Sequence, residues 1–133
     1  MRDSIVSNMF AIAWIGMLLG VISGAVIGLC FHREDWMGGY NSFRRRLTRL
    51  GHISFFGLGF INFFFAISHQ VAGVAASLAF PAAVVFTIGA ATMPTFCFLS
   101  AWKKPFRHFF FIPVTSVAAG IILTLAGWPW PAG

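Results

Sequence analysis

The chain has 133 residues, of which 59% are hydrophobic and 9% are charged, and nine Lys and Arg against three Asp and Glu give a net charge of +6. A soluble domain carries about 25% charged residues and covers much of its surface with polar groups. This composition excludes a soluble globule, a disordered tail and a nucleic-acid-binding module. The two cysteines, Cys30 and Cys97, are too few for a disulfide framework.

Four apolar runs have the length that a helix needs to cross a membrane, which is about 20 residues. The first run is longer than the core of a signal peptide, so we interpret it as a retained helix. Continuous apolarity favours helices over barrel strands, which alternate between apolar and polar residues. We therefore predict an all-α, polytopic membrane protein with a single domain, a bundle of four transmembrane helices. The runs contain no Lys, Arg, Asp or Glu and cover residues 9–31, 51–68, 74–101 and 109–128.

The second helix is expected to begin before its apolar run. Asn41 and Ser42 are candidate N-cap residues, and they follow the helix-breaking pair Gly38 and Gly39. The sequence therefore predicts one long helix from Phe43, whose first turns are basic.

Basic residues are concentrated in the predicted loops 32–50 and 102–108. Lys and Arg are enriched in cytoplasmic loops of membrane proteins. We therefore predict that both loops are cytoplasmic and that both termini lie outside, in what we infer to be a bacterial inner membrane. Eight of the nine basic residues are in these loops: Arg33, Arg44, Arg45, Arg46, Arg49, Lys103, Lys104 and Arg107.

Glycine recurs every four residues along the first predicted helix, which makes three overlapping G-x-x-x-G units on one face. Such a face lets another helix backbone approach closely in a membrane. The pattern predicts tight packing against a helix of this chain or of another protein, and we favour a partner within the chain. The glycines are Gly16, Gly20, Gly24 and Gly28.

Two histidines, His52 and His108, open the second and fourth predicted spans. These spans run in the same direction, so both histidines lie at a similar depth and are candidate axial ligands of a haem b. The segment 50–62, in which Phe and Gly closely follow His52, is similar to helices of b-type cytochromes. The alternative, which we favour, is that both histidines anchor their helices in the headgroup region. Candidate partners for haem propionates are Arg49, Lys103, Lys104 and Arg107.

Asn62 is the clearest polar residue within a span. We favour a hydrogen bond between helices, and a contact with a cofactor or quinone is the alternative. Cys and His residues near the cytoplasmic side suggest a Cu(I) or Zn site, which we favour less because no pair has the close spacing of a known metal motif. The residues concerned are Cys30, His32, His52, Cys97 and His108, with Met93 nearby.

No carboxylate lies in any predicted span, and no Ser or Thr there has an evident base beside it. We therefore expect a non-catalytic subunit or helper of a larger membrane complex of the respiratory or electron-transfer type. A cytochrome with one haem b is the second hypothesis, and a small transporter or channel is the third. The expected partners are the lipid bilayer and other membrane subunits, with a quinone as a further candidate, and no nucleic acid.

Overall fold

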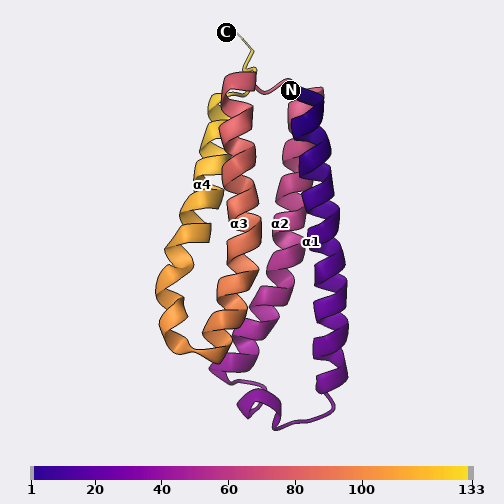
Figure 1. The fold of residues 1–133 in the computed structure, drawn as a ribbon, viewed down its shortest axis with the longest axis vertical. Coiled ribbons are helices and arrows are strands. Elements are labelled where there is room, and N and C mark those ends of the chain that lie inside the picture. Colours follow the sequence, from indigo (N-terminus) through magenta and orange to yellow (C-terminus); the bar gives the residue numbers. More distant parts are fainter. Residues whose placement is uncertain (1, 132–133) are drawn as a thin grey trace.

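The computed structural model describes residues 2–131, and these contain α-helices and short 3₁₀ helices but no strand (Figure 1). The predicted all-α fold is confirmed. Four stretches, 2–30, 43–71, 76–102 and 104–126, are long and apolar enough to cross a membrane, which identifies an integral membrane protein. The elements are α1 (Arg2–Cys30), η1 (Trp36–Gly38), α2 (Phe43–Val71), α3 (Ala76–Trp102), η2 (Lys104–Phe110) and α4 (Phe111–Ala126).

The start of α2 is set by the predicted cap Ser42. Its backbone is extended (φ −64°, ψ 148°), and its hydroxyl oxygen accepts a hydrogen bond from the N–H of Arg45 at 3.1 Å. Because α2 begins at Phe43, the basic residues from 44 to 49 lie on its first turns rather than in a loop. At 29 residues, α1 and α2 are each about 43 Å long, which exceeds a hydrocarbon core of about 30 Å.

The helices form an open row in which each packs mainly against its neighbours in the sequence (Figure 1). Within an apolar segment of 18 residues taken from each helix, the buried share is 39% in α2 and 33% in α3. It is only 17% in α1 and 11% in the η2–α4 stretch. α1 and α4 are therefore the edges of the row, with most of their surface open to lipid or to another protein.

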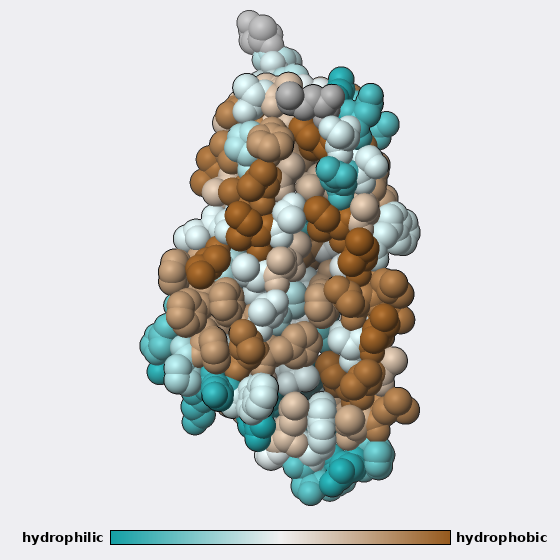
Figure 2. Space-filling view, in the orientation of Figure 1, coloured by the Kyte–Doolittle hydropathy of each residue, from teal (hydrophilic) through white to brown (hydrophobic). Residues whose placement is uncertain are grey.

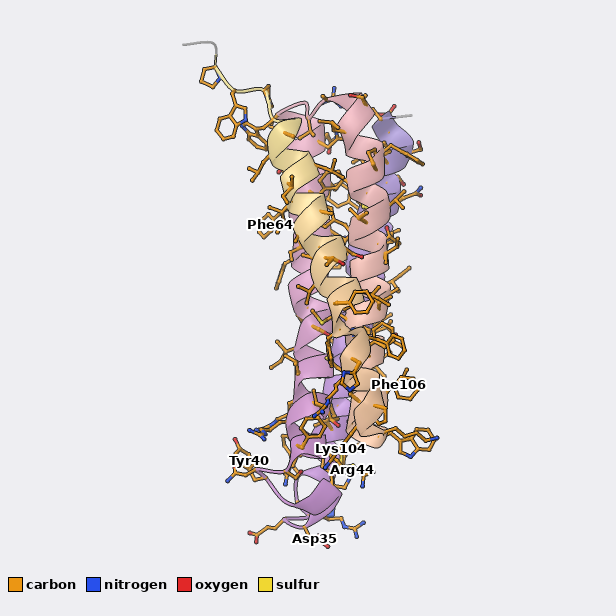
Figure 3. The ribbon with its side chains drawn as sticks, turned by 90° about the vertical axis from the view of Figure 1, so that its left-hand side faces the viewer. Asp35, Tyr40, Arg44, Phe64, Lys104 and Phe106 are labelled. Carbon is orange, nitrogen blue, oxygen red and sulfur yellow. The ribbon has the colours of Figure 1, made fainter. Side chains whose placement is uncertain are left out.

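The row has two distinct ends. Both described ends of the chain lie at one of them, which we call the terminal end, and the segments 31–42 and 103–110 lie at the other, the loop end (Figure 1). Figure 3 shows Asp35, Tyr40, Arg44 and Lys104 together at the loop end. There Nε of Arg44 donates to the carbonyl of Ala101 at 3.1 Å, which ties the start of α2 to the end of α3.

The main apolar core lies in the terminal half. Phe65 of α2 and Phe86 of α3, each 3% exposed, meet there with ring centroids 5.1 Å apart. Arg2 closes this end, because its Nη2 donates to the carbonyls of His69 and Gln70, each at 2.7 Å. The last carbonyls of a helix have no partner within it, so Arg2 caps α2. The other buried core residues are Ile5, Val6, Met9, Ala66, Val74, Ala79, Ala82 and Ala83.

Candidate functional site

Three of the four spaced glycines of α1 pack against α2. A Cβ atom added at Gly16 would lie 3.4 Å from the carbonyl oxygen of Phe55, and one added at Gly20 would lie 2.6 Å from the Phe56 ring. At Gly24 the added atom would lie 2.6 Å from Cε1 of His52, whereas at Gly28 nothing lies within 4 Å. The helix that fills this face of α1 is therefore in the same chain.

Similar close contacts at glycines join the other helices. A Cβ atom on Gly89 of α3 would lie 2.6 Å from Val117 of α4, and one on Gly120 of α4 would lie 2.6 Å from the Phe86 ring. An isolated glycine inside an apolar span is a usable signal for such a contact. It is weaker than the regular spacing on α1, because it defines no helix face.

His52 is held at the interface between α1 and α2. Its Nδ1 lies 3.2 Å from the hydroxyl oxygen of Ser23, which in turn donates to the carbonyl of Gly20 at 3.0 Å. The His52 ring also meets the Phe56 ring edge-on, with centroids 5.5 Å apart. The side chain is thus engaged by α1.

His108 has different neighbours. It is exposed in η2, a segment that packs on α3 and α4 rather than on α1. Among the candidate propionate partners, Arg49 lies over the Tyr40 ring at 4.4 Å and donates to the Tyr40 carbonyl at 3.3 Å. The two predicted ligands thus have different neighbours, because His52 contacts α1 and His108 lies exposed on η2. The remaining three candidate partners are exposed: Lys103, Lys104 and Arg107.

The Cys and His residues of the metal hypothesis are also dispersed. No group of three or more His, Cys, Asp or Glu side chains that could hold a metal ion occurs within residues 2–131. Cys97 is fully buried against Gly51 of α2, while Cys30 is half-buried at the end of α1.

The geometry at His52 makes a specific prediction about haem. A Cβ atom added at Gly24 would lie 3.2 Å from both ring nitrogens of His52, so Nε2 as well as Nδ1 packs against α1. Because this packing leaves no room for a haem at Nε2, we expect the chain purified from haem-replete cells to show no Soret band. An absorption spectrum of the purified protein makes this measurement. A Soret band that is lost in both His52→Ala and His108→Ala would contradict the expectation and restore the cytochrome hypothesis.

Asn62 is completely buried, and its described hydrogen bond stays within α2. Its Nδ2 donates to the carbonyl of Leu58 at 2.8 Å, and its Oδ1 has no partner within the described residues. The structure thus shows no bond from Asn62 to another helix. His69 lies two turns further along, 2% exposed, with its Nδ1 at 3.1 Å from the carbonyl of Val74 across the α2–α3 turn.

We expect Asn62→Leu to raise the free energy of unfolding by about 1 kcal/mol, because it removes a buried acceptor that has no donor and keeps a side chain branched at the same position. Equilibrium unfolding in detergent measures the change. A loss of more than about 1 kcal/mol would contradict this and show that Oδ1 binds a group outside the described chain.

The open row leaves a long groove between α1 and α3. It has two adjoining parts of about 430 and 390 Å³, and Ile12 and Thr87 line both of them. Figure 2 shows this face of the molecule, where paler side chains run between hydrophobic ones. The lining combines bulky apolar side chains, among them Ile15, Leu19 and Phe80, with five small residues: Ala11, Gly16, Ala83, Ala90 and Ala91.

A second groove, between α2 and α4, has about 460 Å³ and an almost wholly apolar lining that includes Ile53, Ala118 and Ile121. A groove of this kind suits hydrocarbon chains, and no polar side chain other than that of Ser54 lines it. The two grooves thus differ in chemistry, since Asn8, Thr87 and Thr95 line the α1–α3 groove.

One arginine of the predicted basic first turns of α2, Arg45, is buried at the loop end. Arg45 is 4% exposed, and its guanidinium carbon lies 4.8 Å from the Phe31 ring centroid, 5.7 Å from that of Trp36 and 5.5 Å from that of Tyr40. The three aromatic rings thus hold the segment between α1 and α2 against the first turn of α2. Aromatic residues flanking a run of arginines are the sequence signal for this arrangement.

Comparison of the chain with known protein families, with curated proteins and with solved structures found no match.

Proposed function

We propose that the protein is a small, non-catalytic subunit or helper of a larger membrane assembly of the respiratory or another electron-transfer type. The observation that carries this proposal is the groove between α1 and α3, which the chain leaves open along much of its length. Small residues at helix contacts let backbones approach closely in lipid. A transmembrane helix of a partner subunit is the occupant that this lining fits best.

Polar groups in the groove support a protein partner over lipid tails. Pro94 has no N–H, so the carbonyl of Ala90 lacks its usual donor four residues further along α3. Asn8 is an exposed amide on the α1 side of the same groove. Hydrogen bonds across membrane helices contribute about 0.6 kcal/mol each on average, and hydrocarbon chains offer no such partners.

Purification in mild detergent tests the proposal. We expect the 14.6 kDa chain to elute together with one or more defined membrane proteins in fixed proportion. A monodisperse monomer without a stable partner would contradict the proposal.

We further propose that the membrane is a bacterial inner membrane, with the loop end in the cytoplasm, because eight of nine basic residues lie near that end. In a background of Cys30→Ala and Cys97→Ala, we expect Gln70→Cys to react with a membrane-impermeant maleimide in intact spheroplasts. Asn41→Cys should not react in intact spheroplasts and should react in inverted membrane vesicles. The opposite labelling pattern would overturn this orientation.

A further inference from the structure

Arg45 is a buried cation that lacks a counter-charge within the described chain. Its Nη1 donates to the carbonyl of Glu34 at 3.3 Å, and its Nε is buried without a partner. None of its contacts within residues 2–131 is with a carboxylate. A guanidinium has five N–H donors, and a buried charge is costly unless it is paired and hydrogen-bonded.

The aromatic rings of Phe31, Trp36 and Tyr40 offset only part of the cost of burying the Arg45 charge. A ring face attracts the positive charge, but it does not replace oxygen acceptors in the plane of the guanidinium. The enclosure therefore stabilises the position of Arg45 and leaves most of its donors without strong acceptors.

A hollow of about 410 Å³ adjoins Arg45 and is lined by Phe31, Glu34, Tyr40 and Arg45 itself. Arg49 lies on the Tyr40 ring, 4.4 Å from its centroid, and adds a second positive charge beside the hollow. The exposed carboxylate of Glu34 is the one negative charge in the lining. Two arginines against one carboxylate leave a net positive site.

We propose that this hollow binds a phosphate group. The planar guanidinium suits the oxygen atoms of phosphate, which it binds through two parallel hydrogen bonds. Arg45 lies outside the uncharged apolar runs, at the loop end, next to the aromatic residues Trp36 and Tyr40. Both a phospholipid headgroup and a soluble phosphate can reach this position.

The test measures binding to the full-length protein in mild detergent, using native mass spectrometry for phosphatidylglycerol and calorimetry for inorganic phosphate. We expect at least one of the two probes to bind. Phosphatidylglycerol alone would identify a lipid headgroup as the source, and binding of inorganic phosphate would identify a soluble one.

Two neighbouring arginines supply the matched comparison. Arg45→Ala should weaken binding by about tenfold or more, which corresponds to losing a charge-assisted hydrogen bond. Arg46→Ala removes the same charge from an exposed position one residue away and should change binding by less than about twofold. Arg45→Lys keeps the charge but not the planar donor pair, so it should also weaken binding. This variant is measured in place of Arg45→Ala if Arg45→Ala fails to fold.

Failure of both probes to bind the wild-type protein would overturn the proposal. An equal loss of binding in Arg45→Ala and Arg46→Ala would also overturn it, because it would show a general attraction to the basic end rather than a site.

Discussion

Gly20→Leu is expected to lower the free energy of unfolding by about 1–3 kcal/mol, the range for overpacking a close contact. A Cβ atom at this position would lie 2.6–2.9 Å from three atoms of the Phe56 ring. That ring is itself packed edge-on against His52, with 5.5 Å between the centroids, so it has little freedom to move aside. Detergent-induced unfolding followed by circular dichroism measures the loss.

Gly28 provides the matched control, because it belongs to the same four-residue repeat on the same helix. An added Cβ atom there meets nothing within 4 Å, so Gly28→Leu should not be destabilising and gains the helix propensity that glycine lacks. Equal destabilisation by the two substitutions would contradict the assignment of the glycine face to packing within the chain.

Ala91→Trp is expected to release the partner subunit while leaving the chain folded. Ala91 is exposed and lines the α1–α3 groove, so an indole there occupies space that the isolated chain leaves open. A tryptophan side chain buries roughly 150–250 Å² of surface when it packs, so it is large enough to keep a helix out of the groove. Co-purification in mild detergent should show the partner lost from this variant.

Ala118→Trp is the corresponding control on α4. Ala118 is also an exposed alanine, but it lines the apolar groove between α2 and α4. We expect this variant to retain the partner. If Ala91→Trp retains the partner, or if both variants lose it, the assignment of the partner to the α1–α3 groove is contradicted.

The fold follows from features that are local in the sequence. The length of each uncharged apolar run determines the number of membrane-crossing helices, and Ser42 caps α2 as its position predicts. The helices extend beyond the apolar runs, however, and in these extensions the side chains of Arg2 and Arg44 donate to carbonyls on neighbouring helices. Hydropathy alone does not reveal such bonds.

The lateral arrangement of the helices is less accessible to sequence analysis. A helix that is apolar all around does not indicate which face meets its neighbour, so nothing in the pattern showed that α1 and α4 would be edges of an open row. The regular glycines of α1 are an exception, because their spacing defines a face. His52 illustrates the difficulty, since its position at the start of the apolar run gave no sign of its contact with Ser23.

Arg45 was equally hidden among its basic neighbours. The sequence run Phe43 to Arg46 contains three consecutive arginines, and only the rotation of α2 distinguishes the buried one from the exposed Arg44 and Arg46. Arg45 is buried because Phe31, Trp36 and Tyr40 of the segment before α2 pack around it. The local sequence around the arginines does not reveal this packing.

Site-specific photo-cross-linking in the native membrane tests the central claim most directly. With benzoylphenylalanine in place of Ala11, an exposed residue of the α1–α3 groove, we predict one cross-linked product of defined mass that contains a second membrane protein. The same probe at Ile122, which is 65% exposed on α4, should give no such product. Absence of a product at Ala11, or the same product at both positions, would contradict the account.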